Sequence, residues 1–161
     1  MDKQLEKLYQ DQIKNEWYSE YLYMSMAAWF ESANLAGFAH WMYLQASEEH
    51  THGRKMFDFL IDRGVKVVLQ AIGQPPADFA SAQDIFEKSL EHEQKVTALI
   101  NGIADMADKV NDRPSKVFIQ WFITEQVEEE KNASRILDML KKIPPNSAGI
   151  FQLDHQLSKR E

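Results

Sequence analysis

The 161-residue sequence contains no cysteine. This absence excludes disulfides, zinc–thiolate sites, cysteine-ligated iron–sulfur clusters and thiol nucleophiles. Any bound metal ion therefore has to be held by oxygen atoms and imidazole nitrogens. The sequence also lacks the hydrophobicity of an integral membrane protein, since its mean hydropathy is -0.48, and we expect no membrane partner.

Signals for export and for nucleic-acid binding are missing as well. No positively charged N-terminal segment is followed by an apolar run and a small-residue cleavage site, so we expect a cytoplasmic protein. A net charge of -7 argues against nucleic acid as the main partner and is compatible with the attraction of cations. With 44% hydrophobic residues and no internal repeat, the chain is expected to form one domain over residues 1–161.

Apolar residues recur at helical spacing along most of the chain, and Gly64, Asp112-Arg113-Pro114 and Pro144-Pro145 interrupt the pattern. The first two predicted helices are separated by a very short break and are expected to form an antiparallel hairpin. The pattern predicts four long helices and a short fifth one, over residues 4–35, 38–63, 81–111, 115–143 and 147–158.

The segment 65–82 has neither a helical nor a strand period and contains Gly73 and Pro75-Pro76. A helix of about 26 residues is about 39 Å long, and 18 extended residues reach at most about 60 Å. The segment can therefore cross a bundle from end to end, so that the third helix runs parallel to the second. The expected fold is an all-α four-helix bundle with one long crossover connection and a short fifth C-terminal helix.

The fifth predicted helix follows Pro144-Pro145-Asn146-Ser147 and carries Ile150, Leu153 and Leu157 on one side. About a dozen residues form only a marginal helix alone. This helix must therefore dock, either on its own bundle or on a neighbouring subunit. His155 is expected on its solvated face.

Glu49 and His52 interrupt the apolar stripe of the second predicted helix. Residues three apart on a helix lie on one face, so both side chains should point into the interior. A buried carboxylate costs several kcal/mol unless it is paired or bound to a cation. This spacing therefore favours a metal-binding pair.

Each of the other long helices also places an acid on its apolar stripe, namely Glu16, Glu93 and Glu129. In a bundle these acids would meet Glu49 and His52 at one level. Four carboxylates and one imidazole suit iron or manganese rather than copper or structural zinc. Di-metal bundles of this class use a Glu from each of two helices and a Glu-x-x-His from each of the other two. Here the second Glu-x-x-His is replaced by the segment from Gln126 to Glu129.

Over its whole length the sequence resembles the bacterial non-haem ferritins. The resemblance rests on Glu16 and Tyr23, Glu48-Glu49-His50-Thr51-His52, His92-Glu93, the segment from Trp121 to Glu130, and the short last helix. It implies a ferritin-like fold and a hollow homo-oligomeric shell of twenty-four subunits. It also implies that the protein oxidises iron(II) with dioxygen or peroxide at a di-iron ferroxidase centre and stores a ferric oxyhydroxide mineral.

The resemblance further implies the roles of individual residues. One iron site would consist of Glu16, Glu49 and His52. Glu49 would bridge to a second site, which adds Glu93, Glu129 and Gln126. A third, looser site would use Glu48, Glu125, Glu128 and Glu129. Tyr23 would lie beside the centre as a hydrogen-bonding and electron-donating residue.

Haem-binding bacterioferritins are a related group. They carry a second Glu-x-x-His and a methionine haem ligand between the Glu and His of the second helix. His50 and Thr51 occupy that position here, so we expect no haem. Two alternatives stay open: a non-storage di-iron peroxidase or oxidase of the same bundle class, and a metal-free helical scaffold with exposed acids. Rubrerythrins usually carry a cysteine-ligated iron module, which the absence of cysteine excludes.

Other polar and aromatic side chains are expected to lie outside the centre. His50 and His92 fall off the apolar stripes and are predicted to be surface residues, and Glu130 is predicted to be solvated. The four tryptophans are expected to serve in core or interface packing rather than in redox chemistry: Trp17, Trp29, Trp41 and Trp121.

Overall fold

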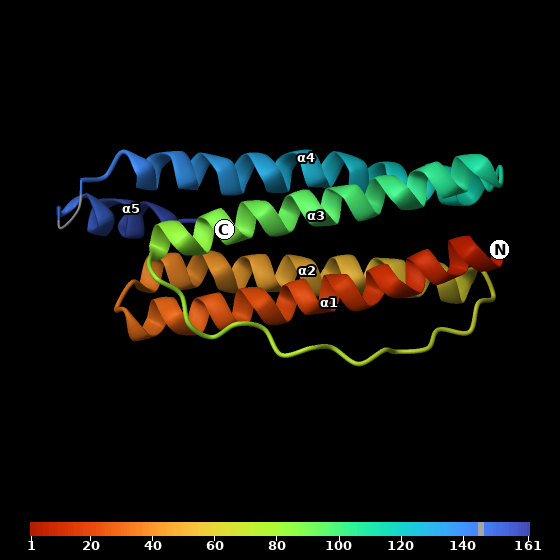
Figure 1. The fold of residues 1–161 in the computed structure, drawn as a ribbon, viewed down its shortest axis with the longest axis horizontal. Helices are drawn as coiled ribbons and strands as arrows, with labels where there is room; N and C mark the ends of the chain where they lie inside the picture. Colours follow the sequence, from red (N-terminus) through yellow and green to blue (C-terminus); the bar gives the residue numbers. More distant parts are fainter. Residues whose placement is uncertain (145–146) are drawn as a thin grey trace.

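The computed structural model describes residues 1–144 and 147–161, and this part of the chain contains five helices and no strand. The helices are α1 (Lys3–Ser32), α2 (Ala36–Asp62), α3 (Ala82–Lys109), α4 (Arg113–Lys141) and α5 (Gly149–Leu157). The four long helices lie side by side along the long axis of the molecule (Figure 1). The all-α bundle predicted from the sequence is confirmed. The largest difference in bounds is at α1, which ends at Ser32 rather than at residue 35.

Three of the long helices end in the same way. Asn34, Gly64 and Asn111 have backbone φ angles of 56°, 68° and 53° and follow the ends of α1, α2 and α3. The backbone N–H of the next residue then donates a hydrogen bond to a carbonyl of the last helical turn, as Leu35 N does to Phe30 O at 3.0 Å. This left-handed residue satisfies carbonyls that the helix leaves free. It also explains why α1 ends before the expected residue.

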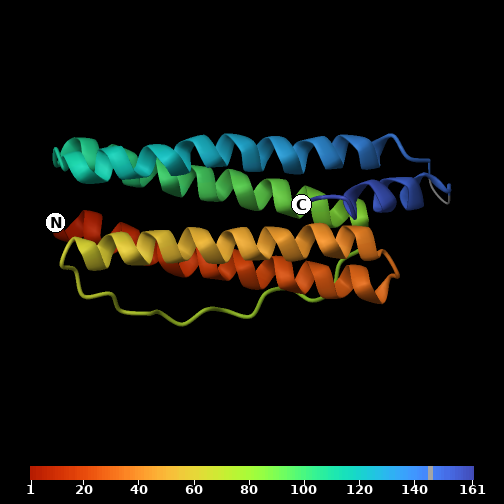
Figure 2. The ribbon, with the colours of Figure 1, turned by 180° about the vertical axis from the view of Figure 1, so that it is seen from behind.

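The connection between α2 and α3 runs along α1 and returns the chain to the opposite end of the bundle (Figures 1 and 2). Side chains of α1 bind its backbone: Gln10 Oε1 accepts from Val68 N at 2.9 Å, and Ser25 Oγ donates to Pro76 O at 2.6 Å. Because the crossover spans the bundle, α3 runs parallel to α2, as the length of this segment predicted.

The hydrophobic core is divided into two halves. One half contains Phe30, Phe38 and Phe86, and the other contains Tyr9 and Leu60. On every long helix, buried polar residues fall between the segments that contribute to these two halves. This polar layer consists of Gln12, Glu16, Ser19, Gln45, Glu49, His52, Ser89, Glu93, Gln126 and Glu129.

Helix α5 docks on α2 of its own bundle, which decides between the two partners that the sequence left open. Leu153 and Leu157 are buried in the core half that contains Phe38. Phe38 N donates to Asp154 Oδ1 at 3.0 Å, so α5 supplies the acceptor that the start of α2 lacks. His155 is exposed, as expected. Part of the proline-rich break before α5, Pro145 and Asn146, lies outside the described residues.

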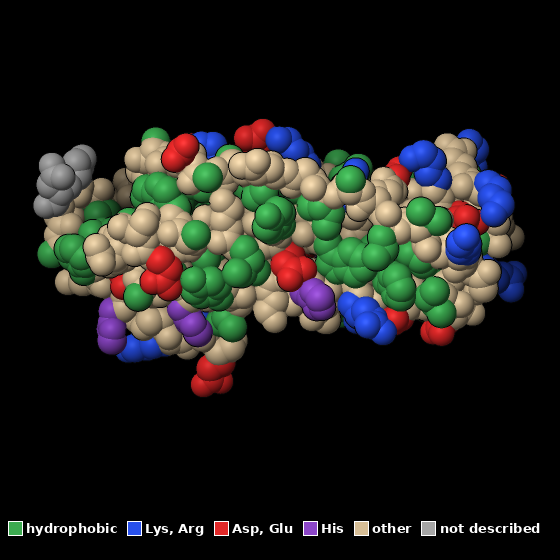
Figure 3. Space-filling view, turned by 90° about the horizontal axis from the view of Figure 1, so that it is seen from below, with side chains coloured by type: hydrophobic (Ala, Val, Ile, Leu, Met, Phe, Trp, Pro, Cys, Tyr) green, Lys and Arg blue, Asp and Glu red, His purple; other side chains and the backbone are tan. Residues whose placement is uncertain are grey.

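Apolar side chains gather on the face of the bundle that carries the crossover (Figure 3). Tyr21, Met24 and Ile72 on this side are 53%, 44% and 40% exposed and line a shallow groove with Trp17. An apolar surface of this kind is typical of a contact with another protein. No described helix combines the length and apolar character needed to cross a bilayer.

Candidate metal centre

The centre of the polar layer consists of four carboxylates and one imidazole, one or two from each long helix. Glu16 and Glu93 are 1% exposed, Glu49 is 2% exposed, and His52 and Glu129 are 4% exposed. Each is placed by the apolar residues one or two turns away on the same helix face, because these fix which side of the helix faces the core. The structure therefore brings together the five residues that the helical pattern predicted to meet.

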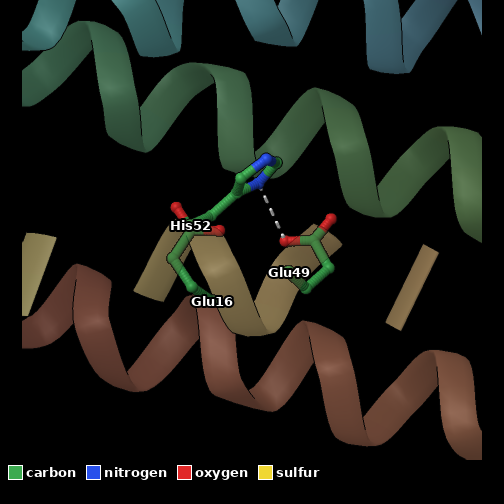
Figure 4. A group of neighbouring side chains, drawn as sticks. All are labelled: Glu16, Glu49 and His52. Atoms are coloured by element: carbon green, nitrogen blue, oxygen red, sulfur yellow. Dashed lines mark ion pairs between the residues drawn. The ribbon is translucent and has the colours of Figure 1, made fainter. Parts of the chain in front are cut away.

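On one side of the centre, Glu16, Glu49 and His52 form a compact group (Figure 4). One ligand atom from each lies within 4.8 Å of the others. His52 Nδ1 is 3.6 Å from Glu49 Oε2, and Gln12 Nε2 donates to Glu16 Oε1 at 2.9 Å. This spacing leaves room for one metal ion with two oxygen ligands and one nitrogen ligand.

On the other side, hydrogen bonds hold Glu93 and Glu129. Tyr23 donates its hydroxyl to Glu93 Oε1. Gln126 Nε2 donates to Glu93 Oε2 at 3.2 Å, and Gln45 Nε2 donates to Glu129 Oε2 at 2.5 Å. Since an amide nitrogen does not bind metal ions, Gln126 can contribute only its Oε1 atom. Tyr23 and Gln126 thus lie beside the acids that they were predicted to accompany.

The residues expected for the third site are only partly brought together. Glu125 joins His52 and Glu129 in a second group whose ligand atoms lie within 4.8 Å of one another. Glu128 is exposed. Glu48 instead accepts a bond of 2.5 Å from Arg160 Nη2. Arg160, in the C-terminal segment, therefore binds the Glu48 carboxylate, on which the third site was expected to depend.

Burial raises the pKa of all four central carboxyl groups because a low-dielectric interior favours their uncharged form. The pKa of Glu93 rises to about 7 and that of Glu129 to about 8. For Glu49, burial and then the nearby charges of Glu93 and Glu16 hold the pKa well above its usual range. Burial also raises the pKa of Glu16, although the hydrogen bond from Gln12 opposes the rise.

The donor set fits iron. Among the described residues, the ion pairs made by lysine and arginine involve none of Glu16, Glu49 and Glu93. These buried acids can ionise together only if a cation from outside the chain neutralises them. Carboxylate oxygens with one imidazole suit a hard or borderline divalent metal ion. The arrangement can therefore bind cations that it does not itself supply.

Two predictions about residues near the centre were wrong. His92 is half-buried rather than on the surface: its Nε2 lies 2.7 Å from Ser19 Oγ, and burial lowers its pKa to about 4. Glu130 is half-buried rather than solvated, and it accepts a 2.6 Å bond from Thr97 Oγ1. Both side chains lie at the edge of an apolar stripe, where the neighbouring helix covers them. His50 is exposed, as predicted.

Trp121 covers His52. Its ring centroid lies 5.3 Å from that of His52 in an edge-on arrangement. Lys55 Nζ lies 3.7 Å from the Trp121 ring on the outer side. Phe122 packs on the imidazole as well, with its ring centroid 6.1 Å from that of His52. The imidazole is thus enclosed by aromatic packing.

Sequence reasoning missed Gln12, Gln45 and Arg160 as neighbours of the centre. Gln45 lies on the predicted inward stripe of the second helix, so its burial among acids could have been inferred. Gln12 is one helical turn before Glu16 and gives the same signal. Arg160 lies beyond the last predicted helix, and no periodicity places it.

Comparison with known proteins places these features in one family. The ferritin-like domain profile matches residues 6–143. The bacterial non-heme ferritin of Bacteroides fragilis is 36% identical over 160 residues, covering 99% of both chains. That of Staphylococcus saprophyticus is 34% identical, covering 99% of this chain and 96% of the relative. An open pore ferritin from the archaeon Archaeoglobus fulgidus superposes with a TM-score of 0.98 at 40% identity, covering 100% of this chain and 99% of that structure.

Proposed function

The chain belongs to the ferritin family and is an iron-storage protein, and we propose that it fills its store by oxidising iron(II) at the buried centre. The observation that carries the proposal is the polar layer. Four buried carboxylates with raised pKa and one imidazole meet there, and the described lysines and arginines form an ion pair with none of these four acids. Such a layer destabilises a metal-free bundle, so binding a cation is the function that accounts for it.

In this proposal the ligands divide between two iron positions. Glu16, Glu49 and His52 bind the first ion, and Glu49 bridges to the second, which Glu93, Glu129 and Gln126 also bind. The group of Glu16, Glu49 and His52 within 4.8 Å supports the first assignment. The amide oxygen of Gln126 is a neutral ligand, so it holds the second ion less firmly than a second imidazole or carboxylate would. A weakly held second ion suits a protein that passes oxidised iron onward.

The reaction is a paired one-electron oxidation. Two iron(II) ions give up one electron each, and dioxygen takes both electrons with two protons to form hydrogen peroxide. Peroxide, when it is the oxidant, takes two electrons and two protons to form two waters. Tyr23, which donates to Glu93, is placed to supply a further electron or to position this carboxylate. The raised-pKa acids release protons when iron binds, and the two protons that the oxidant takes up come from these acids or from water.

Family membership supports a proposal about the assembly and its surroundings. We propose a homo-oligomeric shell of twenty-four subunits in the cytoplasm, each a single domain over residues 1–161, with no haem, nucleic-acid or membrane partner. The apolar face with Tyr21, Met24 and Ile72 supports a contact between subunits. A non-storage di-iron peroxidase or oxidase is the second candidate. Likeness to ferritins over nearly the whole chain favours storage.

Replacing the bridging carboxylate tests the proposed oxidation. We expect Glu49→Ala to slow iron(II) oxidation about tenfold or more, a loss common for changes around metal ligands. The metal-free variant should keep its helical circular dichroism and unfold no more easily than the parent, because a buried acid group that is unfavourable without a metal ion is removed from the layer. Stopped-flow absorbance after mixing with aerobic iron(II) measures the rate.

Glu91→Gln is the matched control, since Glu91 is an exposed acid near the same level of the bundle. It should oxidise iron(II) at the parental rate. An unchanged rate in Glu49→Ala would show that oxidation does not take place at this centre.

A further inference from the structure

Arg160 lies after α5 and is held against the start of α2. His40 Nε2 lies 2.8 Å from Arg160 O. The guanidinium group lies over the Trp41 ring, 4.6 Å from its centroid, and Nη1 also reaches Trp41 O at 3.4 Å. Contacts from both the backbone and the side chain thus fix the C-terminal segment on α2.

From this position the guanidinium group contacts Glu48 directly and is linked to Glu129 through Gln45. Arg160 Nη2 donates to Glu48 Oε2 at 2.5 Å. Arg160 Nη1 donates to Gln45 Oε1 at 3.0 Å, and Gln45 in turn donates to Glu129 Oε2. A continuous series of hydrogen bonds therefore joins the C-terminal segment to a proposed iron ligand. The charge of Arg160 also opposes the rise in the pKa of Glu129.

We propose that Arg160 competes with metal ions for Glu48. A metal ion that leaves the centre has to displace Arg160 before it can bind the Glu48 carboxylate. The inference rests on the proposed function, because it needs ions at Glu129. Glu125 and Glu129 already lie within ligand distance of each other. Glu48 is linked to Glu129 through Arg160 and Gln45, and its side chain is 45% exposed. The link to a proposed ligand and its own exposure make Glu48 the next position that we infer for an ion leaving the centre.

Two consequences follow from the competition. With Arg160 docked, Glu48 binds a metal ion more weakly than the carboxylate alone would. By the same free energy, a metal ion at Glu48 weakens the docking of the C-terminal segment, because coupling between two binding events is reciprocal. Docking of the segment and binding of a third ion then disfavour each other.

The first test uses zinc, which binds carboxylate and imidazole ligands and does not change oxidation state. Calorimetric titration of the metal-free assembled protein should show tight sites at the centre and a weaker one. We expect Arg160→Gln to bind the weaker zinc about two- to fivefold more tightly, the factor expected from loss of a partly exposed ion pair. Arg160→Lys, which keeps the charge, should stay near the parent.

Lys159→Gln is the matched control, because Lys159 is an exposed neighbouring cation. It should leave zinc binding unchanged. The same increase in Lys159→Gln would show a general charge effect and overturn the proposal, as would parental affinity in Arg160→Gln.

The second test reads the C-terminal segment directly and keeps Arg160 in place. Zinc should speed hydrogen exchange in a peptide covering residues 151–161 in the parent, but not in Glu48→Gln. Equal acceleration in both would overturn the proposal. A parent that binds no zinc at the tight sites would instead contradict the proposed function, which distinguishes the two failures.

Discussion

At the scale of single residues, the centre concentrates acids in a place where they ionise poorly. Glu93 and Glu129 have pKa values of about 7 and about 8, mainly because they are buried. The metal-free protein therefore holds protons at neutral pH that the unfolded chain releases. Iron binding has to expel them, so metal affinity should rise with pH over this range.

This difference predicts how stability depends on pH. A carboxyl group with a raised pKa in the folded state stabilises the fold fully below its unfolded pKa and loses this contribution as pH rises through the folded value. The free energy of unfolding of the metal-free protein should therefore fall by a few kcal/mol between about pH 5 and pH 8.5. Urea unfolding with a chelator present, measured at a series of pH values, checks this.

Glu129→Gln should show a smaller fall, because it removes one of the titrating groups. Glu128→Gln removes an exposed acid one position earlier in the chain and should follow the parental curve. If stability rose over this pH range, the acids would have to be ionised in the metal-free fold, contrary to their burial.

Most residues of the centre could be predicted from the sequence because each is an acid or imidazole on an apolar helical stripe. Glu16, Glu49, His52, Glu93 and Glu129 are all buried at the expected level. Side-chain contacts beyond this pattern could not be predicted. Periodicity says which face of a helix is buried, but not which hydrogen bonds form there.

At the scale of the elements, the docking of α5 depends on one close approach. An added Cβ on Gly37 would lie 1.8 Å from Asp154 O, which is far inside van der Waals contact. We therefore expect Gly37→Ala to separate α5 from α2 and lower the free energy of unfolding by about 1–3 kcal/mol, as overpacking commonly does. Urea unfolding and hydrogen exchange in residues 149–157 measure the two effects.

Gly102→Ala is the control, because no atom lies within 4 Å of a Cβ added there. Alanine in the middle of α3 should raise stability by about 0.5–1 kcal/mol. Equal effects of the two substitutions would mean that α5 adapts without cost, so that the contact with α2 does not fix its position.

The helices and the crossover could be predicted because their signals are local. The length of each apolar stripe and the glycine and proline residues that follow it indicate where each helix begins and ends. The length of segment 65–82 allows this segment to span the bundle. The partner of α5 could not be predicted, since a short amphipathic helix fits any apolar groove of its own or another subunit. The close approach of Gly37 to Asp154 determines that α5 docks on α2, and these two residues are more than one hundred residues apart in the sequence.

At the scale of the whole molecule, storage differs from other di-iron chemistry by needing an enclosed space. In the proposed mechanism, a single bundle with two core halves and one polar layer is sufficient for oxidation. Only an assembly of many copies provides a cavity, and the apolar face beside the crossover is a suitable surface for contacts between copies. We propose that each bundle oxidises iron(II) and delivers it to a cavity that the copies form together.

Electron microscopy of the purified protein tests this proposal, with images taken before and after addition of aerobic iron(II) in excess over the two-metal centre. We predict hollow particles of uniform size that gain electron-dense cores in the parent and remain largely empty in Glu49→Ala under the same brief exposure. Single bundles or small oligomers, or iron deposited outside the particles in the parent, would contradict the account.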